Sequence, residues 1–152
     1  MTQQTTVCVH ATTIAWEGQG VLILGASGSG KSTLALHLMA LGCDLVADDQ
    51  TQLSCENQQL IARCPDAIKG KVEARGFGIL NANSVQEAQI ICAVDLDLTE
   101  AQRLPDLKTI DFCGQNIRLF HKPGIEVLPF ALLQYLKITP AQNEKVKSSA
   151  HD

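Results

Sequence analysis

The stretch GASGSGKST, residues 25–33, decides how the chain folds. It fits the pattern G-x-x-x-x-G-K-[ST], in which glycines permit a tight turn and a lysine and a hydroxyl follow at fixed positions. The apolar run VLIL before it predicts a buried strand over 21–24. The segment KSTLALHLMAL after it predicts a buried helix over 31–41 that ends at Gly42. Strand, glycine-rich turn and helix together indicate a phosphate-binding loop.

The residues of this loop are the candidates for nucleotide binding. Backbone N–H groups of such a turn, together with the positive end of the following helix, form a concave site for a polyphosphate. Lys31 is expected to meet the β and γ phosphates and the Ser32 hydroxyl to ligate Mg²⁺, so the expected cofactors are ATP and Mg²⁺. The nucleotide-binding candidates are Gly25, Ala26, Ser27, Gly28, Ser29, Gly30, Lys31, Ser32 and Thr33.

Two neighbouring carboxylates, Asp48 and Asp49, end the apolar run LVA at residues 45–47. A chain that climbs one strand, descends a helix and climbs a second strand makes the two strands parallel, and ligands in such sheets lie at the carboxyl ends of the strands. Both aspartates are therefore expected beside the phosphate loop. One would face Mg²⁺, and the other would take a proton from an attacking hydroxyl. Without the loop, the pair could equally end a strand and begin a turn.

The remaining pattern predicts a single α/β domain over residues 1–138 and a polar, disordered tail over 139–152. The expected elements are a strand pair within 7–16, a polar hairpin within 51–64, a loop and then a strand or short helix within 68–80, a buried strand over 88–98, a hairpin within 109–124 and a closing helix that starts near Pro129.

Composition excludes several kinds of protein. The chain has 152 residues, 45% of them hydrophobic, and a formal net charge of −4, which argues against nucleic-acid and anionic-membrane partners. Its longest apolar runs fall well short of the roughly 20 residues that a membrane span needs, and the first ten residues lack a secretory-signal pattern, so a cytoplasmic location is expected. The six cysteines form no C-x-x-C pair, which favours free thiols over a zinc site or disulfides.

Three stretches, GASGSGKST at 25–33, LVADD at 45–49 and VEARGFGIL at 72–80, together resemble the catalytic domain of HPr kinase/phosphorylase. The resemblance implies a P-loop-containing, PEP-carboxykinase-like α/β fold with a mixed sheet. It implies an ATP-dependent kinase that phosphorylates a serine of HPr, the small phosphocarrier of the phosphotransferase system, and that can reverse the reaction with inorganic phosphate. An HPr-like carrier would be the partner, and the chain would form a homo-oligomer, hexameric by resemblance.

The resemblance also assigns roles to individual residues. Asp48 takes the place of the family's catalytic aspartate, and His10 that of a histidine ahead of the loop, so the catalytic candidates are Asp48, Lys31 and His10. The metal candidates are Ser32, Asp49 and Glu73.

The family's E-x-R-G-x-G signature falls on Glu73, Arg75, Gly76 and Gly78. Arg75 would contact phosphate or support the structure. Arg103 resembles, over two residues only, an arginine that the family uses in the phosphorylase reaction.

Three departures from the family pattern leave other functions open. The chain has no room for the family's N-terminal domain, its closing helix is short, and residues 123–126 read PGIE where the family tends to have PGRN. One alternative is a small-molecule P-loop kinase, although the four arginines are too scattered to supply a phosphate lid. The other is a non-catalytic nucleotide-binding switch, which the PGIE change favours and the intact Lys31, Ser32 and Asp48 disfavour.

Overall fold

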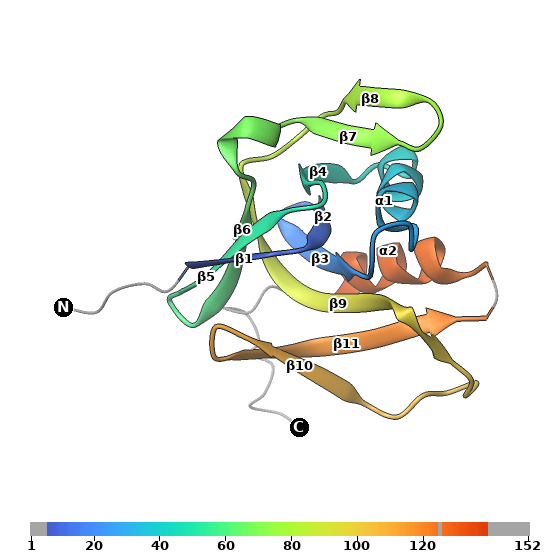
Figure 1. Cartoon of the computed structure of the whole chain (residues 1–152). Coiled ribbons are helices and arrows are strands. Elements are labelled where there is room, and N and C mark those ends of the chain that lie inside the picture. Colours follow the sequence, from blue (N-terminus) through green and yellow to red (C-terminus); the bar gives the residue numbers. More distant parts are fainter. Residues whose placement is uncertain (1–5, 125, 140–152) are drawn as a thin grey trace.

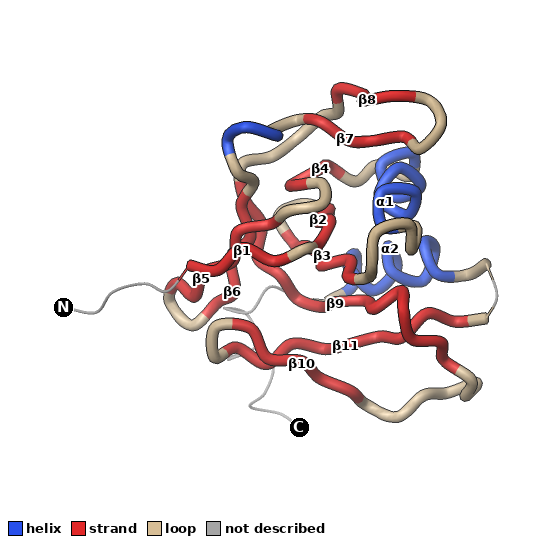
Figure 2. Tube along the Cα trace, in the orientation of Figure 1, coloured by secondary structure: helices blue, strands red, loops and turns tan. Residues whose placement is uncertain are grey.

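A computed structural model describes residues 6–124 and 126–139. In this part of the chain, one large sheet, a separate two-stranded sheet and two helices pack together (Figures 1 and 2). The large sheet contains β1 (Thr6–Val9), β2 (Ala11–Trp16), β3 (Gln19–Leu24), β4 (Asp44–Ala47), β5 (Thr51–Glu56), β6 (Gln59–Arg63), β9 (Glu87–Glu100), β10 (Lys108–Phe112) and β11 (Gln115–Pro123). The small sheet pairs β7 (Lys71–Ala74) with β8 (Gly78–Asn81), and the helices are α1 (Lys31–Ala40) and α2 (Leu128–Ile138). Asp66–Ile68 form a short 3₁₀ turn.

The large sheet is mixed, with the order β1-β5-β6-β9-β3-β2-β4 and with β11 and β10 branching from β9. β3 and β11 run parallel to β9, whereas β6 runs antiparallel to it. β6 pairs with β9 over residues 87–89 and β11 pairs with it over 92–100, so these two strands follow one another along β9. At fourteen residues, β9 is longer than the expected strand over 88–98 because it serves all three neighbours.

The two strands around the phosphate loop run in the same direction, as predicted, but they are not neighbours. β2 lies between them and pairs antiparallel with both β3 and β4. The prediction of a strand pair within 7–16 is therefore wrong: β1 pairs with β5 instead of β2. The strand is interrupted at His10 because β1 and β2 pair with different strands of the sheet.

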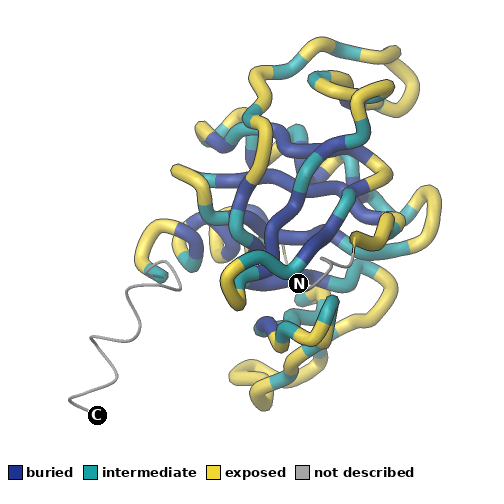
Figure 3. The backbone as a smooth tube through the Cα atoms, turned by 90° about the vertical axis from the view of Figure 1, so that its left-hand side faces the viewer, coloured by how far each residue is buried: buried dark blue, intermediate teal, exposed yellow. Residues whose placement is uncertain are grey.

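The core lies on both faces of the sheet. Figure 3 shows that the buried segments gather in the middle of the molecule. On β3, Val21 and Ile23 pack with the helices, while Leu22 packs on the opposite face against β5, β6 and β9. This explains the uninterrupted apolar run, since a strand covered on both sides has no solvent-facing positions. Leu38 of α1 and Leu136 of α2 complete the helical side with no exposed surface.

Three hairpins of the large sheet turn through two residues, Glu17-Gly18, Asn57-Gln58 and Cys113-Gly114. All six have positive φ, the geometry that matches the twist of the adjoining strands. The predicted hairpins within 51–64 and 109–124 are thus confirmed, although the first is not a polar one, since Leu53, Leu60 and Ala62 are buried.

The prediction of a loop and then one strand or short helix within 68–80 is wrong: two strands, β7 and β8, pair there as a hairpin over 71–81, which lies against α1 at the top of Figure 1. The closing helix is confirmed as α2, with Pro129 in its first turn. The predicted tail lies outside the described residues except for Thr139. No helix in the described ranges has the length and apolarity to cross a bilayer.

All six cysteines are free, as the sequence predicts. Burial raises the pKa of Cys92 to about 12 and that of Cys43 to about 11, so both thiols stay protonated and unreactive near neutral pH.

Candidate functional site

The phosphate loop joins β3 to α1 at the carboxyl end of β3. Gly30 has a φ of 106° and precedes the first helical residue, and no side chain caps the helix. A residue with a Cβ would be strained at this position, and the uncapped N–H groups of the first turn are free for an anion. The loop and the helix end therefore form the expected anion site.

The Lys31 side chain folds back onto the backbone of this loop instead of pointing to solvent. Its Nζ atom donates hydrogen bonds to the backbone oxygens of Gly25, at 2.8 Å, and Ala26, at 3.2 Å, and the residue is only 5% exposed. The ammonium group is thus held at the floor of the site, within the loop that would receive phosphates.

Asp48 follows β4 and is buried beneath the site, with 8% of its surface exposed. Its Oδ1 atom accepts hydrogen bonds from the hydroxyls of Ser32, at 2.6 Å, and Thr12, at 2.9 Å. Its Oδ2 atom accepts the backbone N–H of Glu73 at 2.9 Å. Three donors from three elements compensate the burial of this carboxylate and aim it at the predicted magnesium ligand, Ser32.

Asp49 takes a different position, although it is the next residue. Its φ of 72° is unusual for a residue other than glycine, and the residue lies in the bend between the end of β4 at Ala47 and the start of β5 at Thr51. The side chain is 60% exposed, and its Oδ1 atom lies 2.7 Å from Nε2 of His10. Strained backbone of this kind recurs at functional sites. Asp49 and His10 thus form an accessible carboxylate–imidazole pair.

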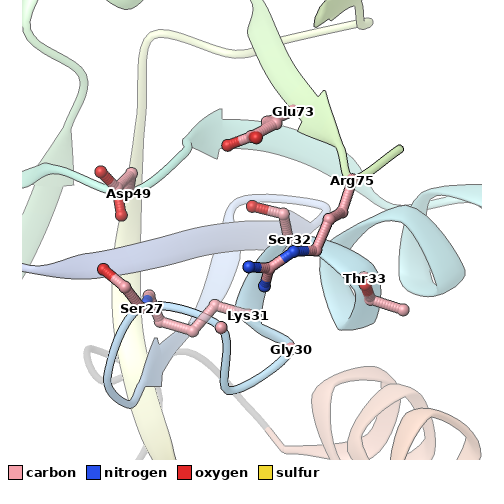
Figure 4. Close-up of a pocket in the computed structure, with 9 residues that line it drawn as sticks. Ser27, Gly30, Lys31, Ser32, Thr33, Asp49, Glu73 and Arg75 are labelled. Carbon is pink, nitrogen blue, oxygen red and sulfur yellow. The ribbon is translucent and has the colours of Figure 1, made fainter. Parts of the chain in front are cut away.

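A pocket of about 200 Å³ lies between the loop and β7 (Figure 4). This volume is below the 300–1,000 Å³ range typical of pockets that enclose a small organic ligand, and it suits the phosphate end of a nucleotide. Its lining consists of Ser27, Gly28, Gly30, Lys31, Ser32, Thr33, Asp49, Glu73 and Arg75.

Glu73 and Arg75 reach the pocket from the β7 end, as Figure 4 shows. The Arg75 guanidinium lies so close to Gly28 that its Nη1 atom would be 3.1 Å from a Cβ there. The pocket therefore combines two cations, Lys31 and Arg75, with two carboxylates, Asp49 and Glu73, an arrangement that suits phosphate together with a metal ion.

The described residues contain no cluster of three or more His, Cys, Asp or Glu side chains able to hold a metal by themselves. Mg²⁺ is commonly held by one or two carboxylates together with substrate phosphates and water, so Ser32 with one carboxylate of the pocket, Glu73 or Asp49, fits Mg²⁺ arriving with a nucleotide.

Not every candidate comes to the pocket. Gly76 and Gly78, with φ of 81° and 144°, form the β7–β8 turn and do not line it. His10 contributes only through Asp49. Arg103 is exposed in the loop 101–107 between β9 and β10 and is absent from the pocket lining.

Sequence reasoning missed two residues that support the site. Thr12 bridges the aspartates, because its hydroxyl donates to Asp48 and accepts the Asp49 N–H at 3.0 Å. Asp97 of β9 accepts the backbone N–H of Ala26 at 2.9 Å. The only local signal for Thr12 is its place two residues after His10, and Asp97 has none because its partner lies 71 residues away.

The family model named HPr Serine kinase C-terminal domain matches residues 2–110, most of the chain. The chain belongs to this family. An HPr kinase/phosphorylase of Bacillus cytotoxicus is 44% identical over 135 residues, covering 78% of this chain and 44% of that protein. One from Halalkalibacterium halodurans is 37% identical over 109 residues, covering 66% of this chain and 35% of that protein. The chain therefore spans less than half of the length of these two curated relatives.

The solved structure of the Hpr(Ser) kinase/phosphatase from Coxiella burnetii has a TM-score of 0.73 and 27% sequence identity, and the match covers 96% of this chain and 94% of that one. The predicted α/β fold with a mixed sheet is thus confirmed as that of the HPr kinase catalytic domain.

Proposed function

We propose that the chain is an ATP-dependent protein serine kinase that acts on an HPr-like phosphocarrier protein. The observation that carries this proposal is that two separate carboxylates lie at the phosphate loop. Asp48 is buried and accepts a hydrogen bond from the Ser32 hydroxyl, whereas Asp49 is exposed and contacts His10. Phosphoryl transfer needs both a metal-side group and a group that accepts the proton of the attacking hydroxyl. The family membership and the named relatives support the serine of HPr as the acceptor.

The loop residues would hold ATP by its phosphates. Lys31 would turn from the carbonyls of Gly25 and Ala26 to the β and γ phosphates, and Arg75 would meet the γ phosphate from the opposite wall. Mg²⁺, when bound with ATP, supplies positive charge to the phosphates. Ser32, oriented by Asp48, would hold the metal together with Glu73. Positioning and charge neutralisation would account for most of the catalysis.

The resemblance assigns catalysis to Asp48 and metal binding to Asp49, and the contacts support the opposite assignment. Asp48 already accepts three hydrogen bonds and does not line the pocket, so it suits the metal side. Asp49 lines the pocket and is exposed, so it would orient the acceptor serine and take its proton, with His10 stabilising the carboxylate. In the reverse reaction with inorganic phosphate, the same carboxyl would return the proton to the serine oxygen.

The test is incubation of HPr from the same cell with this protein and Mg-ATP, followed by intact-mass spectrometry. The expected result is a gain of one phosphate on a serine. Asp49→Asn should abolish that gain and retain ATP binding, whereas Asp48→Asn should also weaken Mg²⁺-dependent ATP binding. An active Asp49→Asn variant would contradict the base assignment. ATP binding without any modified carrier would shift the function to a small-molecule kinase or a regulatory switch.

We further propose a cytoplasmic location and a homo-oligomeric state, hexameric by family resemblance. The charge of −4 supports a protein partner over a nucleic acid or an anionic membrane. Size-exclusion chromatography with light scattering would measure the oligomer directly.

A further inference from the structure

The end of β9 forms the wall behind the phosphate loop. β9 is the parallel neighbour of β3, and Leu24, the last residue of β3, is paired with Asp95. The next side chain, Leu96, lies so close to Gly25 that its Cβ would be 3.3 Å from a Cβ placed there. Residues 95–97 therefore run alongside the beginning of the loop, where β9 leaves β3 in Figure 1.

Asp97 makes a direct contact from this wall to the loop backbone. Its Oδ2 atom accepts the N–H of Ala26 at 2.9 Å, and its own backbone N–H donates to Oδ1 of Asp95 at 2.9 Å. The second bond fixes the local turn that aims the Asp97 carboxylate at the loop.

Ala26, whose N–H donates to Asp97, also has a carbonyl oxygen that accepts two hydrogen bonds. It accepts the Ser29 N–H at 3.0 Å and the Lys31 ammonium at 3.2 Å. If Lys31 turns to the phosphates of a bound nucleotide, the carbonyls of Gly25 and Ala26 lose its hydrogen bonds. The contact from Asp97 does not depend on Lys31, so it can remain when the lysine moves.

We propose that Asp97 is a positioning residue that keeps the phosphate loop in its nucleotide-binding shape after Lys31 has turned to the phosphates. This inference rests on the proposed nucleotide-binding function. A direct role in phosphate binding is excluded by chemistry, since a carboxylate repels phosphate, and by position, since Asp97 does not line the pocket. Asp97 acts through its acceptor oxygen, so asparagine, which keeps that oxygen, can replace it.

The experiment measures the dissociation constants of Mg-ATP and Mg-ADP by titration calorimetry for the wild type, Asp97→Ala and Asp97→Asn. Asp97→Ala should weaken both nucleotides about fivefold, the effect of one lost hydrogen bond of ordinary strength. Asp97→Asn should stay within about twofold of the wild type. In the phosphorylation assay, Asp97→Ala should raise the KM for ATP and leave kcat nearly unchanged.

Asp111→Ala is a matched control, because Asp111 is also exposed and its carboxylate also accepts a backbone N–H, that of Gly114, at 3.2 Å in the turn of the β10–β11 hairpin. It should leave both dissociation constants unchanged. Asp97 itself is exposed, so its variants should fold as the wild type does, and the urea midpoint of each variant checks this directly.

Unchanged nucleotide affinity in Asp97→Ala would overturn the inference, as would equal losses in Asp97→Ala and Asp97→Asn, because the charge and not the acceptor would then matter. Either result, with nucleotide bound by the wild type, leaves the proposed function intact. A wild-type protein with no affinity for Mg-ATP would overturn the proposed function and this inference together.

Discussion

Thr12 is the residue that keeps two neighbouring aspartates in different roles. Its hydroxyl donates to the buried Asp48 and accepts the N–H of Asp49, and the residue has no exposed surface. A single side chain therefore couples the position of the metal-side carboxylate to the backbone that presents the exposed one.

We expect Thr12→Val to lower the phosphorylation rate about tenfold and the free energy of unfolding by about 1–3 kcal/mol. Valine has a similar shape but leaves a buried carboxylate oxygen and the Asp49 N–H without this partner. Steady-state kinetics and urea unfolding measure the two effects. Thr12→Ser, which keeps the hydroxyl, should retain most of the rate; an equal loss in Thr12→Ser would show that the methyl group matters instead.

At the scale of elements, the β5–β6 hairpin is joined by a charged network. Arg63 on β6 contacts both carboxylate oxygens of Glu56 on β5 and also reaches Glu87 on β9. Hydrogen bonds from Arg63, and then from Ser54, lower the pKa of Glu56 from its ordinary 4.5 to about 2. Because ionised Glu56 is favoured in the folded state, its contribution to stability is present above pH 4.5 and is lost as the pH falls toward 2.

We expect the difference in unfolding free energy between the wild type and Glu56→Gln to be constant from pH 7 to about pH 5 and to shrink at lower pH. Urea unfolding at a series of pH values measures this difference. Asp66→Asn is the control, since the Asp66 side chain is fully exposed and lies 3.8 Å from Lys69. A difference that grows on acidification would refute the assignment to Glu56.

Local patterns predict the elements around the phosphate loop well and the pairing of strands poorly. The helix over 31–41 and the strand over 21–24 have strong local signatures, and both form, although β3 begins two residues earlier, at Gln19, and α1 ends one residue earlier, at Ala40. That β2 lies between β3 and β4, and that β9 serves three neighbours, depends on contacts distant in sequence. Asp97 cannot be predicted for the same reason. Asp48 and Asp49 can be predicted because they follow the end of β4, which lies at the same edge of the sheet as the end of β3, where the loop begins.

At the scale of the whole molecule, α1 links the site to the core. Leu38 has no exposed surface and belongs to the same cluster as Leu136 of α2 and Val94 of β9. Stability and site geometry therefore share one helix, whose first turn borders the phosphate site and whose later turns are packed.

We expect Leu38→Ala to lower the free energy of unfolding by about 2–5 kcal/mol, the usual effect of emptying such a position. Leu98→Ala, at a position that is 46% exposed, should change it by less than about 0.5 kcal/mol. Urea unfolding compares the two. If Leu38→Ala lowered the free energy of unfolding no more than Leu98→Ala does, the stability of α1 would not depend on the packing of Leu38.

The central place of β9 also bears on the order of events during protein synthesis. The ribosome synthesises the chain from its N-terminus, so the phosphate loop is made well before β9, the strand that supports it. Asp97, the partner of the Ala26 N–H, is added 71 residues after Ala26. Until then, the edge of β3 that later pairs with β9 has no partner. A nascent chain should consequently acquire its nucleotide site late, only after the segment that contains Asp97 has been synthesised.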